Sequence, residues 1–364
     1  MKIALIHEWL TSVAGSERVL LEMTRIFPQA PIYTSVFNPK AAAAFADKDV
    51  RTSFLQRVPL ARRREILVPL TPLAFEQFDL SEFDVVISST HMAAKGVITK
   101  PGTISIAYCH TPPRYLWEPR VDPRANSGRL AWLRRKTAHN LRLWDRVAAE
   151  RVDHYIANSY YIAQRIKKYY KKDSTVIYPP VEVEKFQPAG EGEVGDHYLF
   201  VSRLIGYKKA DLVIEAFNRL GYPLKVIGQG PERRRLMRMA KSNIDFLGFL
   251  SDDELGRYYA RAKAFVFPAE EDFGLVPVEA MAAGRPVLAY TIGGAAETVV
   301  PGETGELFSE QTSESLAAAV AKFDPGRYDP AKIRRHALNF SAERFRQELE
   351  TKVKELVKTH RNNR

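Results

Sequence analysis

The sequence of 364 residues has a single cysteine, Cys109, so an internal disulfide bond and a cysteine-rich zinc site are both excluded. It has no run of about 18 apolar residues, which excludes a transmembrane helix. The first ten residues, MKIALIHEWL, are too short and too polar for a signal peptide, so we expect a cytoplasmic protein. No segment repeats at a period of about 20–50 residues, which argues against a solenoid or a propeller.

The sequence also lacks the two glycine patterns most often linked to nucleotide binding, G-x-G-x-x-G and the Walker loop. The loop from His7 to Arg18 leads from a strand through small residues, Gly15 and Ser16 among them, into a helix. That order suits the close approach of a phosphate, although it matches neither pattern. The Gly228-Gln-Gly230 turn is too short a match to carry weight. Dinucleotide-binding and P-loop interpretations are therefore weak.

Short apolar strands alternate with amphipathic helices along the chain, which is the pattern of an α/β protein with parallel sheets. A polar stretch at 182–196, with one proline and three glycines, separates two such series. We therefore expect two doubly wound domains, 1–182 and 183–343. A charged helix at 344–364 could cap the second domain, but we expect it to pack back on the first. The predicted strands are 2–7, 83–89, 103–110, 154–159, 174–181, 198–203, 224–228, 244–248, 264–268 and 286–290.

The net charge of +11 is unevenly divided. Residues 1–185 have 28 basic and 18 acidic side chains, whereas the remaining residues have 26 and 25. A basic half implies an anionic partner, which can be a nucleic acid, an anionic membrane surface or a phosphorylated substrate. No helix-turn-helix, RNA-recognition or zinc-finger pattern is present, so we expect no nucleic-acid partner.

The segment FPAEEDFGLVPVEAMAAG, residues 267–284, carries the strongest chemical signal. A buried strand ends at Pro268, a loop with three acids follows, and a helix starts near Gly274. The amides at the start of this helix suit an anion or sugar oxygens. Glu271 and Glu279 bracket that helix end, and a carboxylate can accept two hydroxyls of a sugar or a ribose. The spacing alone also allows acids that only serve the helix dipole, with a solvated Glu279.

Two further motifs place polar residues at strand ends, where open α/β folds bind ligands. Arg203 and Lys208 follow the strand at 198–203, and two fixed cations there can hold a diphosphate without a metal ion. The alternative is a basic surface turn. His110 ends the strand at 103–110 and is followed by Pro-Pro, which holds it rigidly. It is either a catalytic residue or a structural histidine with satisfied hydrogen bonds.

Taken together and in this order, these motifs resemble the retaining glycosyltransferases of family 4. The resemblance covers nearly the whole chain, and its most specific part is the pair of glutamates Glu271 and Glu279, separated by seven residues. HTPPRYLW and SSTHMAAKG resemble a subgroup, the bacterial O-antigen and exopolysaccharide mannosyltransferases. The segments that match the family are AGSERV, SRLIGYKKADLVIEAFNRL, EDFGLVPVEAMAAGRPV, IGGAAETVVPGETGELF and RRHALNFSAERF.

The resemblance implies a GT-B fold, in which two Rossmann-like domains face a central cleft. It implies that Arg203 and Lys208 neutralise the departing diphosphate of a nucleotide-sugar donor and that His110 lies at the reacting sugar. It assigns the ribose hydroxyls to Glu279 and the transferred sugar to Glu271. Catalysis would therefore depend on His110, Glu271, Arg203 and Lys208, with no cofactor and no metal ion. The implied donor-binding residues are Gly15, Arg203, Lys208, Glu271, Phe273, Gly274, Leu275, Val276 and Glu279.

Two positions depart from the family pattern. Ala14 replaces the first glycine of the N-terminal loop, and Ser202 replaces the glycine before the phosphate-binding arginine. Both residues are small, so neither closes its loop. The donor base is set by backbone contacts, around 246–250 and the turn near Gly228. We expect GDP-mannose as the donor, from the subgroup resemblance, with UDP-glucose, UDP-N-acetylglucosamine and a GDP-rhamnose type of donor as alternatives.

The acceptor is expected to be a glycan, lipid-linked or free, bound by the basic first half. The resemblance places His91, Lys95 and Arg114 on that side. Two clusters, 57–64 and 124–146, mix basic residues with leucine and tryptophan. We expect them to dock the protein peripherally on the anionic inner face of the cell membrane. A helix that packs its leucines and tryptophans inward and leaves a solvated basic face is the alternative.

Three other classes compete with a glycosyltransferase. A nucleic-acid binder would leave the donor-site motifs unexplained. A sugar-nucleotide epimerase or a phosphorylase of the same fold would need a different set of glutamate and histidine residues, or a cofactor lysine. A catalytically inactive subunit that binds sugar nucleotides is argued against by the intact Arg203, Lys208, Glu271, Glu279 and His110.

Overall fold

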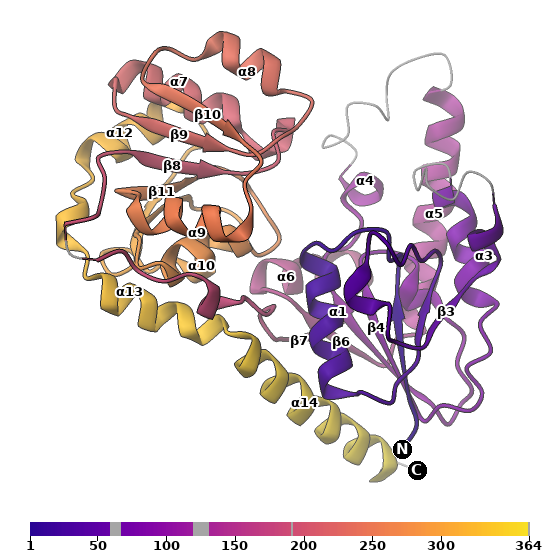
Figure 1. The fold of residues 1–364 in the computed structure, drawn as a ribbon. Helices are drawn as coiled ribbons and strands as arrows, with labels where there is room; N and C mark the ends of the chain where they lie inside the picture. Colours follow the sequence, from indigo (N-terminus) through magenta and orange to yellow (C-terminus); the bar gives the residue numbers. More distant parts are fainter. Residues whose placement is uncertain (59–66, 119–130, 191, 363–364) are drawn as a thin grey trace. The chain divides into compact units, whose positions relative to one another are not determined.

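The computed structural model describes residues 1–58, 67–118, 131–190 and 192–362 and divides the chain into two compact units (Figure 1). The N-terminal unit comprises 1–180 together with 345–364, and the C-terminal unit comprises 181–344. Each unit is built on its own parallel sheet with helices packed against it. The prediction of an α/β fold with two doubly wound, Rossmann-like domains is confirmed.

The N-terminal sheet has seven parallel strands in the order β3-β2-β1-β4-β5-β6-β7. The order reverses direction between β1 and β4, which creates a switch point where the connections leave to opposite sides. The strands are β1 (Ile3–His7), β2 (Ile32–Thr34), β3 (Val50–Thr52), β4 (Val85–Thr90), β5 (Ile104–Cys109), β6 (His154–Ala157) and β7 (Ser174–Val176). The helices of this part are α1 (Gly15–Ile26), α3 (Thr71–Glu76), α4 (Arg114–Trp117), α5 (Ala131–Glu150) and α6 (Tyr160–Tyr170).

The C-terminal sheet repeats this plan with six parallel strands in the order β10-β9-β8-β11-β12-β13. Its switch point lies between β8 and β11. The strands are β8 (Tyr198–Val201), β9 (Leu224–Ile227), β10 (Ile244–Gly248), β11 (Ala264–Phe267), β12 (Val287–Tyr290) and β13 (Gly305–Phe308). The helices are α7 (Ala210–Leu220), α8 (Arg233–Met239), α9 (Asp252–Arg261), α10 (Leu275–Ala282), α11 (Ala295–Thr298), α12 (Ser313–Lys322) and α13 (Pro330–Ala337).

The last helix, α14 (Ala342–Asn362), starts in the C-terminal unit and belongs to the N-terminal unit for most of its length (Figure 1). Phe345, Leu349 and Val353 on this helix are fully buried in the core of the N-terminal sheet. Arg346 donates a hydrogen bond of 2.5 Å to Glu22 of α1. The helix therefore supplies part of the core of a domain that lies far before it in the sequence.

None of the described helices combines the length and the apolar character that crossing a bilayer requires. The two short strands β2 and β3 and the strand β13 were not predicted from the sequence. The remaining strands lie where the sequence predicts them, with ends that differ by up to five residues.

Candidate active site

The C-terminal unit brings Lys208 and Glu271 together at its switch point. Lys208 lies in the turn after β8, and Glu271 lies in the loop after β11, the neighbouring strand. The Lys208 ammonium donates a hydrogen bond to Glu271 Oε1, and the two side chains are 16% and 19% exposed. The pair is thus accessible to a ligand at the carboxyl edge of the sheet, which is where doubly wound folds bind their ligands.

Arg203 lies on the same side of the sheet, two residues after the end of β8. Its side chain is exposed, and no acidic side chain within the described part of the chain forms an ion pair with it. The sequence-predicted cations Arg203 and Lys208 therefore both lie at this edge. Lys208 is in an ion pair with Glu271, and the Arg203 side chain is open to solvent.

Gly294 fixes the position of the loop that carries Glu271. The Gly294 amide donates a hydrogen bond of 2.8 Å to the Glu271 carbonyl. A Cβ atom on Gly294 would lie 2.3 Å from the Phe273 Cα atom, so only glycine permits this approach of the two backbones. Phe273 is itself buried and packs on the Phe340 ring, with the ring centroids 5.8 Å apart. Main-chain contacts with Gly294 therefore hold the acidic loop in place.

Helix α10 starts directly after this loop, with Gly274 as its N-cap, so the amides of Phe273 to Val276 lie at the positive end of the helix. Glu279, on the second turn, is 7% exposed and accepts a hydrogen bond of 3.1 Å from the Tyr259 hydroxyl of α9. The alternative of a solvated Glu279 is therefore wrong, because this carboxylate is buried and held by a buried tyrosine.

The carboxyl ends of β9 and β10 meet beside this region. The Gly228 amide donates a hydrogen bond of 2.7 Å to the Gly248 carbonyl, which links the two turns that follow these strands. Phe249, the next residue, is 81% exposed. These are the turns in which the sequence predicts the backbone contacts to the donor base.

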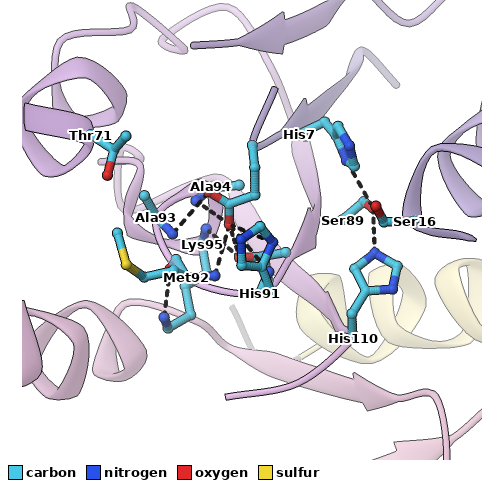
Figure 2. A network of polar contacts seen from close by, with 12 residues as sticks. His7, Ser16, Thr71, Ser89, His91, Met92, Ala93, Ala94, Lys95 and His110 are labelled. Atoms are coloured by element: carbon cyan, nitrogen blue, oxygen red, sulfur yellow. Dashed lines mark hydrogen bonds and ion pairs between the residues drawn. The ribbon is translucent and has the colours of Figure 1, made fainter. Parts of the chain in front are cut away.

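In the N-terminal unit, three strand ends bring His7, Ser89 and His110 into one row (Figure 2). His7 ends β1, Ser89 lies near the end of β4, and His110 follows β5. The Ser89 hydroxyl lies 3.1 Å from His7 Nδ1 and 2.8 Å from His110 Nε2. Burial, reinforced by the neighbouring His7 and His91, lowers the pKa of His110 to about 3. His110 is therefore a neutral imidazole at neutral pH.

The loop before α1 is ordered by Glu17. Its Oε2 atom accepts hydrogen bonds of 3.0 Å from the Ala14 amide and from the Ser16 hydroxyl, on either side of Gly15. Its Oε1 atom lies 3.8 Å from His7 Nε2. Burial opposes the ionisation of Glu17, but its interactions with His7 and Ser16 outweigh burial and lower its pKa to about 2. Glu17 is a carboxylate that joins the Gly15 loop to the row of histidines.

A second buried carboxylate, Glu8, organises the loop after β4, of which His91, Met92, Ala93 and Ala94 are labelled in Figure 2. It accepts hydrogen bonds from the Thr90 hydroxyl at 2.9 Å and from four successive amides, those of residues 91–94, at 2.8–3.2 Å. Burial opposes the ionisation of Glu8, yet His91 and these donors lower its pKa. His91 is held at the exposed side of this loop, with its ring edge against Trp9. Glu8 thus fixes where His91 lies.

The structure does not support the prediction that Lys95 contacts an acceptor. Lys95 is 1% exposed, and its ammonium forms a buried ion pair with Asp145 of α5 and donates to the Met92 carbonyl at 2.6 Å. A buried, paired ammonium serves packing rather than ligand binding. Arg114 is half-buried beside the Tyr161 ring, at 6.0 Å from its centroid. His91 and Arg114 remain predictions for the acceptor side.

Helix α5 exposes part of the mixture of apolar and basic side chains that the sequence predicts for the cluster 124–146. Trp132 is 61% exposed, and Leu133, Leu143 and Val147 are also exposed. Arg134, Arg135 and Lys136 lie exposed among them. Leu141 instead packs inward, and the Trp144 indole donates to Glu76 at 2.8 Å. The predicted basic residues at 62–64 and the beginning of the second cluster, 124–130, lie outside the described residues.

Within the described ranges, no group of three or more histidine, cysteine, aspartate or glutamate residues is placed to hold a metal ion. Lys208 forms an ion pair with Glu271, and Arg203 follows the same strand, β8.

Several residues of these sites were not singled out from the sequence. Glu8 had a signal, because a glutamate directly after the apolar run IALIH is an unusual charge at the end of a buried strand. Glu17 had a weaker one, three residues after Ala14 at the start of a helix. Ser89 and Tyr259 had none, because their partners are 21 and 20 residues away in the sequence.

Two doubly wound sheets, each with its polar residues at the switch point, define a class of fold, that of the GT-B glycosyltransferases. Solved structures of that class have the same fold. Sucrose-phosphate synthase from Thermosynechococcus elongatus matches 99% of this chain and all of its own, with a TM-score of 0.76 and 18% identity. HepE from Anabaena in complex with UDP matches 98% of this chain and all of its own, with a TM-score of 0.70 and 17% identity.

The sequence itself narrows the class. Residues 13–185 match the family model described as Glycosyltransferase Family 4, and residues 182–338 match the model described as Glycosyl transferases group 1. The chain therefore belongs to the glycosyltransferases that combine these two domains.

Among curated relatives, a GDP-mannose-dependent alpha-(1-6)-phosphatidylinositol monomannoside mannosyltransferase of Mycobacterium tuberculosis is 30% identical over 172 residues, which are 40% of this chain and 45% of that protein. The chain spans about half the length of the curated relatives it matches.

Proposed function

We propose that this protein is a retaining hexosyltransferase that moves mannose from GDP-mannose to a lipid-diphosphate-linked or other glycan acceptor in the synthesis of a cell-surface polysaccharide. The observation that carries the proposal is the accessible Lys208–Glu271 pair at the switch point of a glycosyltransferase domain. The GDP-mannose dependence of the mycobacterial relative supports the donor. UDP bound to HepE, a protein of the same fold, is the reason to keep a UDP-sugar as the alternative.

In the proposed donor site, Lys208 exchanges its partner Glu271 for the diphosphate of the donor. Lys208 neutralises Glu271 through their ion pair. When a diphosphate binds to Arg203 and Lys208, the Glu271 carboxylate becomes available to accept hydroxyl hydrogens of the transferred sugar, beside the amides of Phe273 to Val276. Glu279, oriented by Tyr259, accepts the ribose hydroxyls. The same few residues therefore recognise three parts of one donor.

The chemistry follows from charge. The bond between the sugar's anomeric carbon and the diphosphate breaks through an oxocarbenium-like transition state, and negative charge accumulates on the leaving group. Arg203 and Lys208 stabilise that charge, which is the largest contribution such a site makes. The acceptor oxygen attacks on the face from which the diphosphate leaves, and its proton passes to the departing phosphate oxygen. The N-terminal unit contributes the Gly15 amide to the diphosphate and His110 to the reacting sugar.

Two cations in place of a metal ion make the proposed reaction metal-independent. Full transfer activity in excess EDTA is the expected result. Activity that disappears with EDTA and returns with Mg²⁺ or Mn²⁺ would contradict this part of the proposal.

The donor is tested by a panel of GDP, UDP and ADP and their common sugar conjugates, read by thermal shift and by release of free sugar. Stabilisation by GDP with slow release of mannose from GDP-mannose is expected. Stabilisation by UDP would retain the site and replace the donor. A protein that binds a sugar nucleotide but never turns it over would be the inactive subunit considered above.

The site is tested by Glu271→Ala and Lys208→Ala, each of which is expected to reduce turnover by about 100-fold or more with the fold intact. The chain offers a matched control pair. Lys263 and Asp196 form an ion pair of 2.9 Å beside the same two strands, β11 and β8, at their amino ends. Lys263→Ala and Asp196→Ala are expected to leave turnover unchanged. Near-normal activity of either site variant would contradict the assignment.

We propose further that α5 docks the protein peripherally on the inner face of the cell membrane, where a lipid-linked acceptor is found. Exposed Trp132 and Leu133 lie beside exposed arginines, which is the composition that anionic bilayers attract. Co-sedimentation with phosphatidylglycerol vesicles at low salt is expected, and Trp132→Ser with Leu133→Ser is expected to weaken it. Met237→Ser, an exposed apolar residue among the arginines of α8, is the control. Absence of vesicle binding by the unaltered protein would overturn the docking.

A further inference from the structure

The row of buried groups in the N-terminal unit extends beyond the two histidines and the serine. It begins at Glu17 of α1, passes through His7 and Ser89, and ends at His110, with separations of 3.8, 3.1 and 2.8 Å. Glu17, His7 and Ser89 are each at most 3% exposed, so water does not compete for these contacts. Figure 2 shows the Ser89 hydroxyl between the two imidazole rings.

The order of donors along this row follows from its first member. Glu17 is ionised and faces His7 Nε2, so the His7 proton is held on that nitrogen. A doubly protonated His7 would donate to Ser89, but if His7 carries only this one proton, its other nitrogen, Nδ1, is an acceptor and takes the hydrogen of the Ser89 hydroxyl. A hydroxyl has one hydrogen, so the Ser89 oxygen must accept from His110 Nε2. His110 Nδ1 is left as a hydrogen-bond acceptor.

We propose that Glu17, His7 and Ser89 are positioning residues that hold His110 as the neutral Nε2–H tautomer and present its Nδ1 atom as an acceptor for a donor-sugar hydroxyl. The role of the tautomer in catalysis rests on the proposed function, since that function places His110 at the reacting sugar. The tautomer itself depends only on the contacts within the N-terminal unit.

The same carboxylate also controls the loop proposed to contact the diphosphate. Glu17 Oε2 holds the Ala14 amide and the Ser16 hydroxyl, whereas Oε1 faces His7. One side chain therefore connects a loop that binds the donor to the residue at the reacting sugar. Removing the Glu17 carboxylate should affect both the Gly15 loop and His110, whereas removing the Ser89 hydroxyl should affect only His110.

The experiment is ¹⁵N NMR of the imidazole nitrogens in histidine-labelled protein, with His110→Asn to identify the signals of residue 110. The unaltered protein is expected to show a protonated Nε2 and an unprotonated Nδ1 at His110. In Ser89→Ala, the two nitrogens are expected to shift toward the average of exchanging tautomers. Ser89→Thr, which retains the hydroxyl, is expected to show the protonated Nε2 and unprotonated Nδ1 of the unaltered protein. Ser88→Ala, the neighbouring residue on the other face of β4, is the matched control and should change nothing.

Kinetics of the same variants separate positioning from general damage. Ser89→Ala is expected to lower kcat about tenfold, the effect of one hydrogen bond, with an unchanged KM for the donor. Glu17→Gln is expected to lower kcat and to raise the KM for the donor, because it also disturbs the Gly15 loop.

The NMR spectra test the proposal independently of whether the protein shows transferase activity. A protonated Nδ1 at His110 in the unaltered protein, or a Ser89→Ala spectrum identical to it, would overturn the row of donors described here. Failure of every donor in the activity panel would instead overturn the proposed function, and the spectra would still judge the contacts among Glu17, His7, Ser89 and His110.

Discussion

At the scale of single residues, buried carboxylates hold loops and side chains in place. A carboxylate removed from water is stable only where donors replace the lost hydration. Glu8 accepts five hydrogen bonds from one loop, which hold that loop in place. Glu279 accepts a hydrogen bond from the Tyr259 hydroxyl on its Oε2 atom, at the edge where a donor is proposed to bind. One buried carboxylate therefore positions a loop, whereas the other is itself positioned by a buried tyrosine.

The first prediction concerns Tyr259→Phe. Loss of the hydroxyl leaves the Glu279 carboxylate without this orienting hydrogen bond, which is worth about 1 kcal/mol. We expect the KM for the donor to rise about fivefold and kcat to change little, because ribose binding contributes equally before and during the reaction. Tyr258→Phe, on the neighbouring residue, is the control. Equal kinetic effects of the two variants would show that Tyr259 does not act through Glu279.

The second prediction concerns Lys95, which joins three elements through Asp145. The carboxylate also accepts from the Trp117 indole at 2.7 Å and from the Tyr170 hydroxyl at 2.9 Å. Lys95→Met leaves a buried, uncompensated charge, which we expect to lower the free energy of unfolding by about 3–5 kcal/mol. Removing both charges, with Lys95→Met and Asp145→Leu, should cost less than the sum of the single changes. Urea unfolding of the three variants measures this, and strict additivity would contradict the coupling.

At the scale of elements, the site is held by contacts between loops that follow neighbouring strands. The Glu271 loop follows β11, and Gly294 lies in the loop after β12, so the parallel pairing of these strands brings the two backbones together. This packing explains how a residue without a side chain determines where a functional carboxylate lies.

The third prediction is therefore Gly294→Ala. The added methyl group would lie 2.3 Å from the Phe273 backbone, so the acidic loop must move. We expect at least tenfold weaker donor binding, measured by calorimetry, with little change in the far-ultraviolet circular dichroism. Gly256→Ala on α9 is the control, since its added Cβ atom lies no closer than 3.8 Å to a neighbour and alanine favours a helix. Unchanged donor affinity in Gly294→Ala would show that the loop is not positioned in this way.

The elements also explain how much could be predicted from the sequence. Strands such as β5, β8 and β11 are mostly apolar runs. The polar residues that follow them, His110, Arg203 and Glu271, are expected at the binding edge because parallel strands of a sheet all end at one edge. The strands β2 and β3 have three residues each, too few to show a pattern, and β13 begins with a glycine and a glutamate. The partners Ser89–His110 and Tyr259–Glu279 are set by strand pairing and helix packing, which sequence periodicity does not encode. Lys95 was misjudged for the same reason, because its partner Asp145 is 50 residues away.

At the scale of the whole molecule, the last helix joins the first domain. Phe345, Leu349, Val353, Leu356 and Val357 of α14 complete a core whose other members come from residues before 180. The N-terminal unit therefore folds fully only when a segment beyond the C-terminal unit is present.

The fourth prediction is that Leu349→Ala destabilises the N-terminal unit. The cavity in its core is expected to cost about 2–5 kcal/mol. All four tryptophans of the sequence, at positions 9, 117, 132 and 144, belong to this unit, so their fluorescence reports its unfolding alone. Lys354→Ala, on the same helix with its side chain 69% exposed, is the control. A tryptophan transition that is the same in Leu349→Ala and in the unaltered protein would contradict a role of α14 in this core.

The fifth prediction uses the same fluorescence to follow the pH dependence of stability. The pKa of His110 is about 3 in the folded protein, against an ordinary value near 6.5. Between these values the unfolded chain binds a proton that folded His110 does not, so stability is full above about pH 6.5 and falls as the pH is lowered toward 3.

The loss from His110 by pH 5 is about 1–2 kcal/mol, allowing for its partial exposure. Glu17, with a folded pKa of about 2, adds to the loss only below about pH 4.5. His91 and His154, whose pKa values are also lowered, are present in every variant and cancel in the comparison. Urea unfolding at pH 7 and pH 5 should therefore show a smaller loss of stability in His110→Asn than in the unaltered protein, and His139→Asn on the exposed face of α5 should retain the original loss. Equal losses in His110→Asn and the unaltered protein would mean that His110 is not held neutral by burial, and the acceptor role of its Nδ1 atom would lose its basis.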